Sequence, residues 1–316
     1  MKRSAGSILL GILVAAAAAA ATPASAYTVP YGGSAMSSAI SNEAFTPQSI
    51  VGANNGCKPT AAHPYPVVLV HATFADEGSN WVTLAPLLAN NGYCVYAFNY
   101  GATWLSQCDF IFGCRVDALD SIKTSAGQLG SFISSVLSKT GATKVDLVGH
   151  SQGGMMPHYY TKVLGGAAKV HNFVALSPSN HGTTLDGLTT FVNKFPFWAN
   201  LTMDLIAVIG APSLTDQEVG SAFIKTLFGS GDPVMTGINY TVIQTKNDEV
   251  VTPYTNAFLT GSTVKNILIQ NQCPNDPVAH IGMFDDSPAM QNVLNALSSS
   301  PNPNFTATCT NYGPPL

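Results

Sequence analysis

One serine, Ser151, stands at a position suited to nucleophilic chemistry. It lies in the pattern Gly-x-Ser-x-Gly, between Gly149 and Gly153, with the apolar run 144–148 before it and helix-compatible residues after it. A strand that turns sharply into a helix exposes a serine Oγ at the end of a sheet, and the flanking glycines let neighbouring backbone approach closely. The pattern alone is weak in a chain rich in glycine and serine, but the strand and helix around it predict Ser151 as a nucleophile.

A nucleophilic serine needs a histidine base and an acid that orients the histidine. In sheets of this kind they follow in the order Ser, then Asp or Glu, then His, each from a loop at the carboxyl end of a strand. Asp248 follows the apolar run 240–244, and His280 follows the run 266–270 across a loop. Position and order therefore predict Asp248 as the acid and His280 as the base.

Other residues remain as alternatives for these roles. Glu249 can replace its neighbour Asp248, and Asp248 itself can be an ordinary solvated turn carboxylate. His181 lies at the same edge of the expected sheet and is predicted to line the substrate pocket, because as a base it would precede the acid, against the order of the fold. His158 falls in a helix and His171 before a strand, where ordinary surface or core roles suffice.

The tetrahedral intermediate of acyl transfer carries a negative oxygen that two backbone N–H groups usually stabilise. One comes from the residue after the nucleophile, here Gln152, and the other from the loop after an earlier strand. Thr73 follows the apolar run 67–70 and is the predicted second donor, and its hydroxyl can add a third. The alternative for Thr73 is an ordinary threonine at a strand end.

Short apolar runs alternate with segments of helical spacing along the chain. Helical spacing appears in 81–88 and 129–137. Strands that alternate with helices predict an α/β fold with a mostly parallel, doubly wound sheet and helices on both faces. Residues 27–65 show no sustained period, so they are expected to wrap the surface, with regular structure beginning at Pro66. The six predicted strands are 67–70, 93–98, 144–148, 173–176, 240–243 and 267–269.

The segment 183–233 interrupts this rhythm between two strands that need only one crossover helix, and it is predicted to be an inserted cap. Pro196 suits the first turn of a helix. Trp198, Leu201 and Leu205 then recur at three- and four-residue intervals, on one face. We expect these three side chains to bind the substrate, although a helix that completes the core is the alternative.

Composition limits the classes of partner. Charged residues make up 9% of the chain and the net charge is −4, so no basic surface is expected to bind nucleic acid. Hydrophobic residues make up 46%, which suits an exported enzyme that handles apolar material and also a merely well-packed core. No Cys-x-x-Cys pair occurs, so zinc is disfavoured, and neither a metal nor a cofactor is expected.

The N-terminus has the features of a signal peptide, predicted to comprise residues 1–26. Basic residues open it, an apolar run follows over 8–21, and Ala24-Ser25-Ala26 suits signal peptidase. A membrane anchor is the alternative, but the apolar run is shorter than the ~20 residues that span a bilayer. We therefore expect a secreted, extracellular protein, with residues 27–316 forming one catalytic domain and no membrane segment after cleavage.

From Val67 to His280 the chain resembles the secreted bacterial triacylglycerol lipases, most closely the actinobacterial class 2 lipases. The resemblance implies an α/β-hydrolase fold and hydrolysis of lipid esters, with an esterase of short or polymeric esters, an acyltransferase and an inactive binding protein as alternatives. It rests on Val-Leu-Val-His-Ala-Thr-Phe-Ala-Asp at 68–76, Gly-His-Ser-Gln-Gly-Gly at 149–154, Ser-Pro-Ser-Asn-His-Gly at 177–182, Asp-Glu-Val-Val-Thr-Pro at 248–253 and Ala-His-Ile-Gly at 279–282.

The resemblance also implies roles for individual residues. It supports the same nucleophile, acid and base, with Thr73 and Gln152 as oxyanion donors. One departure concerns the oxyanion loop, where the family usually has His-Gly and this chain has His71-Ala72. Glycine tolerates backbone angles that alanine resists, so Phe74 remains an alternative donor and a candidate for substrate contact. A monomer is the expected oligomeric state.

All six cysteines lie after the expected signal peptide, and three disulfides are predicted for a protein sent to an oxidising compartment. Fifteen pairings are possible. The resemblance to secreted lipases favours pairing between neighbours in the sequence, which spacing alone does not establish. The expected pairs are Cys57 with Cys94, Cys108 with Cys114, and Cys273 with Cys309.

Overall fold

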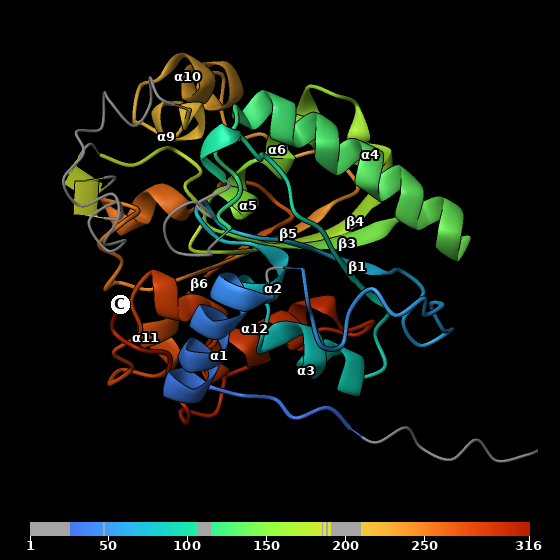
Figure 1. Ribbon diagram of the computed structural model, residues 1–316. Coiled ribbons are helices and arrows are strands. Elements are labelled where there is room, and N and C mark those ends of the chain that lie inside the picture. The colour runs from blue at the N-terminus through green and yellow to red at the C-terminus, as the bar shows by residue number, and fades with distance from the viewer. Residues whose placement is uncertain (1–25, 47, 107–114, 185, 188, 191–209) are drawn as a thin grey trace, which may run out of the picture.

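The computed structural model describes residues 26–316 except 47, 107–114, 185, 188 and 191–209. Six parallel strands in the described residues form one sheet in the order β2-β1-β3-β4-β5-β6 (Figure 1). Each overlaps one of the predicted apolar runs. The strands are β1 (Val67–Val70), β2 (Val95–Ala97), β3 (Val145–His150), β4 (Val170–Leu176), β5 (Asn239–Gln244) and β6 (Val264–Leu268).

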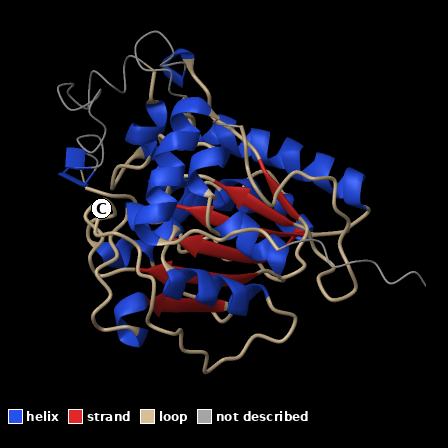
Figure 2. Ribbon diagram, turned by 60° about the horizontal axis from the view of Figure 1, so that its bottom comes forward, coloured by secondary structure: helices blue, strands red, loops and turns tan. Residues whose placement is uncertain are grey.

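Helices cover both faces of this sheet, as the alternating pattern predicted (Figure 2). In Figure 1, α4 (Ile122–Thr140), α6 (Pro157–Lys162), α9 (Pro212–Asp216) and α10 (Ala222–Phe228) lie above it. Below it lie α1 (Gly32–Phe45), α3 (Leu84–Asn90) and α12 (Ser287–Leu297). The shorter helices are α2 (Glu77–Asn80), α5 (Gln152–Met155) and α11 (Ile269–Gln272), with 3₁₀ turns at Trp104–Ser106, Gly166–Lys169, Tyr254–Ala257 and Ile281–Phe284.

The strands read as continuous apolar runs because both of their faces are buried. In β1, Val68 and Val70 point into the apolar core beneath α4 and α10. Val67 and Leu69 point into the second core, beneath α3 and α12. The sheet thus separates two cores, and its strand ends are the places where polar side chains can gather.

The order of the strands reverses between β1 and β3. The chain passes from β1 outward to β2, then returns to pair β3 with the other side of β1. Loops that leave neighbouring strands in opposite directions open a crevice at the carboxyl edge, where open α/β sheets bind their ligands. Thr73 and Ser151 follow these two strands, so the topology brings them to the same place.

The expectation that regular structure begins at Pro66 is wrong, because residues 32–45 form helix α1. The buried residues of α1, Ala35 and Ala39, have small side chains. The segment therefore shows little apolar periodicity in the sequence. Tertiary contact stabilises the helix, since the Asn42 side chain donates to the Gly78 carbonyl oxygen of α2 at 2.8 Å.

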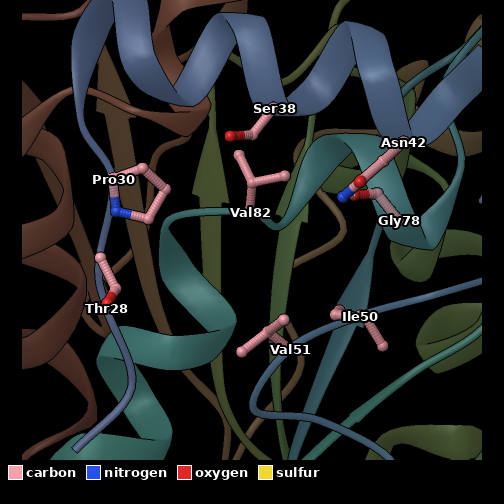
Figure 3. Close-up of a pocket in the computed structure, with 8 residues that line it drawn as sticks. All are labelled: Thr28, Pro30, Ser38, Asn42, Ile50, Val51, Gly78 and Val82. Atoms are coloured by element: carbon pink, nitrogen blue, oxygen red, sulfur yellow. Dashed lines mark hydrogen bonds between the residues drawn. The ribbon is translucent and has the colours of Figure 1, made fainter.

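A hollow of about 420 Å³ lies under α1 (Figure 3). The residues that line it are Thr28, Pro30, Ser38, Asn42, Ile50, Val51, Gly78 and Val82.

Two of the three expected disulfides are confirmed. Cys57 is bonded to Cys94, and Cys273 to Cys309. The third expected pair, Cys108 with Cys114, lies outside the described residues. In the part of the chain that the structure describes, we find no helix with the length and apolar character needed to cross a bilayer.

The predicted cap lies only partly within the described residues. Its C-terminal half contains α9 and α10, and Thr183 forms an isolated parallel bridge with Glu218. Trp198, Leu201 and Leu205 lie outside the described residues, as do residues 1–25 of the expected signal peptide. The cap and its substrate contacts therefore stay predictions.

A buried acidic cluster lies where the chain enters α12. Asp286 caps this helix, accepting from the N–H of Ala289 at 2.8 Å and from that of Gly313 at 2.9 Å. Its neighbour Asp285 is fully buried, and within the described residues neither of its carboxylate oxygens has a hydrogen-bond partner. Burial, and then the charge of Asp286, raise the pKa of Asp285 to about 8.

This pKa makes the stability of the protein depend on pH. The folded chain holds the Asp285 proton that the unfolded chain releases near pH 4, so the stability linked to this proton is present in acid and lost as the pH rises through about 8. We expect the melting temperature to fall between pH 5 and pH 9, and Asp285→Asn to flatten that fall by several degrees. The measurement is thermal unfolding followed by circular dichroism across this range. The partly exposed Asp120→Asn is the control; an Asp285→Asn variant with the wild-type slope would contradict the assignment.

Candidate active site

The backbone at Ser151 turns sharply between β3 and α5. Ser151 has φ 55° and ψ −121°, a conformation that side-chain-bearing residues rarely adopt. Its N–H donates to the Leu176 carbonyl oxygen of β4 at 2.9 Å, which ties the turn to the neighbouring strand. Such strain persists only where the surrounding structure enforces it, and it clusters at functional sites.

The two glycines of the pattern are required by close backbone contacts. A Cβ on Gly149 would lie 1.9 Å from the Gly153 carbonyl oxygen. A Cβ on Gly153 would lie 2.1 Å from the Val70 carbonyl oxygen at the end of β1. Because the atoms met are backbone, no side chain can move aside to make room. This turn from β3 into α5, called the nucleophile elbow below, therefore packs directly against β1, the strand that leads into the predicted oxyanion loop.

The structure brings the three predicted residues together. His280 Nε2 lies 3.0 Å from Ser151 Oγ, and His280 Nδ1 lies 2.9 Å from Asp248 Oδ2. The other oxygen of Asp248, Oδ1, accepts from the N–H groups of Val250 at 2.9 Å and Val251 at 2.7 Å. Both side chains of the pair are almost completely buried. This geometry can pass a proton from the serine to a histidine that a fixed carboxylate orients.

The alternatives occupy other positions. Glu249 accepts from the backbone N–H of His280 at 3.5 Å, whereas the imidazole itself contacts Asp248. His181 uses both ring nitrogens elsewhere, at 2.7 Å from Asp232 Oδ1 and 2.9 Å from the Asn256 carbonyl oxygen. The ring of His181 thus contacts Asp232 and Asn256 and contacts neither Ser151 nor Asp248 in the described hydrogen bonds.

Two further histidines, His158 and His171, have structural surroundings. His158 is fully buried and stacks on Tyr240, and burial lowers its pKa to about 3. His171 pairs with Asp146 at 2.9 Å. The ordinary roles expected for both histidines agree with these contacts.

Thr73 and Gln152 are buried side by side. The Thr73 hydroxyl donates to Gln152 Oε1 at 2.6 Å, so in this state its proton points to the glutamine. Neither backbone N–H has a hydrogen-bond partner among the described residues. By contrast, the N–H of Phe74 donates to the Asp117 carbonyl oxygen at 3.1 Å, and the Phe74 side chain is fully buried. The geometry therefore favours Thr73 over Phe74 as an oxyanion donor.

Alanine at position 72 causes no backbone strain. The positive φ of this loop falls at Phe74, with φ 61°, and Ala72 is not among the residues with positive φ. In this conformation the Phe74 N–H donates to the Asp117 carbonyl oxygen. The departure from the family's usual glycine is thus accommodated.

Two residues that the sequence did not single out connect the loops of the site. His150 Nε2 lies 3.1 Å from the His280 carbonyl oxygen, and its Nδ1 lies 3.3 Å from Asn80 Oδ1. Asn80 Oδ1 in turn accepts from the N–H of Ala72 at 2.8 Å. Burial lowers the pKa of His150 to about 3, so the ring is neutral and its single N–H can donate to one of these two oxygens at a time. In the sequence, the position of His150 directly before Ser151 indicates a role in the site. No local pattern marks Asn80 as part of the site.

Comparison with known proteins supports the expected relationship. The family described as Lipase (class 2) matches residues 64–292, which is more than half of the chain and includes the serine, the acid and the histidine. The chain belongs to the class 2 lipase family. Membership confirms the resemblance predicted from the motifs.

Two curated relatives match a shorter segment. A triacylglycerol lipase of Pseudarthrobacter phenanthrenivorans is 35% identical over 108 residues, covering 33% of this chain and 30% of that protein. A triacylglycerol lipase of Burkholderia plantarii is also 35% identical over 108 residues, covering 33% of this chain and 26% of that protein. The match thus spans less than a third of the length of either relative.

Solved structures show the fold. Lipase B of Aspergillus fumigatus superposes with a TM-score of 0.58 at 23% identity, over 83% of this chain and 57% of that one. The mature lipase BlEst2 of Bacillus licheniformis gives a TM-score of 0.53 at 16% identity, over 76% of this chain and 94% of that one. Together with the parallel sheet, these similarities show that the chain adopts the α/β-hydrolase fold.

Close packing at the elbow yields a direct test. In Gly153→Ala the new methyl group meets the carbonyl oxygens of Val70 and His71, so the oxyanion loop must shift. We expect ester hydrolysis to fall on the order of 10²-fold or more, since displacements near 1 Å have that effect, and the melting temperature to fall. Gly127→Ala in α4 is the matched control: its methyl meets open space, and helix propensity predicts a gain of ~0.5–1 kcal/mol. Equal activity in the two variants would contradict this account.

Proposed function

We propose that this protein is a secreted carboxylic ester hydrolase of the lipase type, with Ser151 as its nucleophile. The observation that carries the proposal is the His280 imidazole, which lies within hydrogen-bond distance of both Ser151 Oγ and Asp248 Oδ2 in a buried site. Membership of the class 2 lipases supports the same chemistry.

Acylation begins with the bound ester. Ser151 Oγ attacks its carbonyl carbon while the hydroxyl proton passes to His280 Nε2, and the carbonyl oxygen becomes negative. The backbone N–H groups of Thr73 and Gln152 stabilise this oxygen, and Asp248 stabilises the imidazolium. When the tetrahedral intermediate collapses, the bond to the leaving alcohol breaks and His280 returns its proton to the alkoxide. An acyl ester on Ser151 remains.

Deacylation repeats these steps with water. The neutral His280 takes a proton from a water molecule, whose oxygen attacks the acyl carbon. Collapse of the second intermediate releases the carboxylic acid, and His280 returns the proton to Ser151 Oγ. The burial of Asp248 and its three hydrogen bonds, to His280, Val250 and Val251, keep its carboxylate fixed through both halves of the reaction.

We infer that the substrate is a lipid ester handled outside the cell. The names of the curated relatives, both triacylglycerol lipases, support this substrate class. Two disulfides and the N-terminal segment with the pattern of a signal peptide support export. The chemistry assigned to the serine, histidine and aspartate requires no cofactor.

Replacing the nucleophile tests the mechanism. Ser151→Ala should lower kcat by ~10⁴- to 10⁶-fold, because members of such a triad act as a unit, and His280→Ala should be nearly as severe. The measurement combines ester hydrolysis with labelling by a fluorophosphonate probe, which should modify the wild type and not Ser151→Ala. The exposed Ser131→Ala in α4 serves as the control and should keep full activity. Substantial hydrolysis by Ser151→Ala would overturn the assignment.

Chain-length preference tests the substrate class. Each acyl methylene that the enzyme buries contributes ~0.8 kcal/mol, or about fourfold in kcat/KM. We expect kcat/KM for p-nitrophenyl esters to rise from acetate through butyrate to octanoate. An optimum at acetate would reassign the protein to the short-chain esterases, and transfer of the acyl group to an added alcohol in preference to water would indicate an acyltransferase.

A further inference from the structure

Gln217 reaches the oxyanion donors from a distant part of the chain. It directly follows α9, in the long segment between β4 and β5, and it is buried with 4% of its surface exposed. Its side-chain Nε2 lies 3.1 Å from Thr73 Oγ1 and 3.1 Å from Gln152 Oε1. One amide group thus contacts the side chains of both predicted donors.

A hydrogen bond to the amide oxygen fixes the orientation of the Gln217 amide. The Ser179 hydroxyl donates to Gln217 Oε1 at 2.8 Å, which turns the NH₂ group toward the site. The backbone of Gln217 is also held, since its carbonyl oxygen accepts from the N–H of Thr183 at 2.8 Å. Thr183 Oγ1 donates to the carbonyl oxygen of Val250, in the loop that follows Asp248. Gln217 is therefore anchored between the loop that follows Asp248 and the loop that contains Thr73.

The hydrogen bonds of Gln217 indicate how this residue affects the proposed reaction. Thr73 has one hydroxyl proton, and in this structure Gln152 Oε1 accepts it. If that hydroxyl turns toward a substrate oxygen, Gln152 Oε1 loses a donor in a buried place, which by itself is unfavourable. Gln217 Nε2 shares its two protons among this oxygen at 3.1 Å, Thr73 Oγ1 at 3.1 Å and the Ser213 carbonyl oxygen at 3.2 Å. It can therefore donate to Gln152 Oε1 when the hydroxyl turns away, so this acceptor stays satisfied.

We propose that Gln217 is a positioning residue. It frees the Thr73 hydroxyl to donate to the oxyanion, and it fixes the Thr73 and Gln152 side chains relative to each other. This inference rests on the proposed function. Gln217 acts through the two donors and need not touch the substrate itself. Gln217, directly after α9, then completes the proposed oxyanion site.

A double-mutant cycle tests the proposal. Gln217→Met keeps the length of the side chain and removes its hydrogen bonds, and Thr73→Val removes the hydroxyl while keeping the backbone N–H. We expect each variant to lower kcat by about tenfold or more, up to the ~10²- to 10³-fold loss that follows removal of an oxyanion donor, with KM changed by less than about threefold. Because Gln217 acts through Thr73, the double variant should be little worse than the more severe single variant.

The controls separate this role from ordinary loss of a buried amide. Gln272→Met removes bonds to Asn292 and Phe305 near the C-terminal disulfide and should leave kcat unchanged at a similar loss of melting temperature. If Gln217→Met fails to fold, Ser179→Ala, which only releases the amide orientation, takes its place in the cycle and is expected to show a smaller, equally non-additive loss of kcat.

Each outcome decides the matter. A kcat within about twofold of the Gln272→Met control, or losses that multiply fully in the double variant, would overturn the role of Gln217. Fluorophosphonate titration of the wild type and each variant supplies the concentration of active serine. A wild type that fails to label at Ser151 would refute the proposed function instead, so the two failures are distinguishable.

Discussion

The close packing of α5 against the end of β1 is the constraint on which the rest of the site depends. Gly153 lets the helix come so near that one added methyl group would overlap the carbonyl oxygens of Val70 and His71. Because β1 and β3 are neighbours in the sheet, this approach sets the loop after β1 directly beside Ser151. The turn between the sheet and α5 keeps Ser151 at a positive φ. In this conformation the Ser151 Oγ lies within hydrogen-bond distance of His280.

Several buried polar groups at this edge hydrogen-bond to one another across different loops. His150 contacts the His280 carbonyl oxygen, and Asn80 accepts from the oxyanion loop, so the base loop and the oxyanion loop are held through side chains beside the serine. Both oxygens of Asp248 are bonded as well. A site built in this way is organised before substrate arrives, and its dipoles act in a medium that contains little water.

The long segment between β4 and β5 takes part in this organisation. Thr183 pairs with Glu218, donates to the loop after Asp248, and supports Gln217 against the oxyanion donors. Helix α10 meanwhile adds apolar side chains to the core beneath α4. The proposed insertion would therefore affect the proposed reaction through contacts with the loops of the site, without contributing the nucleophile, the acid or the base.

The sequence by itself determined the features that depend on local order. Six apolar runs predicted six strands, and the glycines around Ser151 predicted the elbow, because period, spacing and backbone freedom are written in neighbouring residues. Only the tertiary structure showed helix α1, whose buried face is alanine, and the contacts of Asn80 and Gln217. The partners of these two amides lie up to 144 residues away in the chain. Such pairings are decided by where the strand ends meet and by the need of buried polar atoms for partners, and neither is encoded in any local pattern.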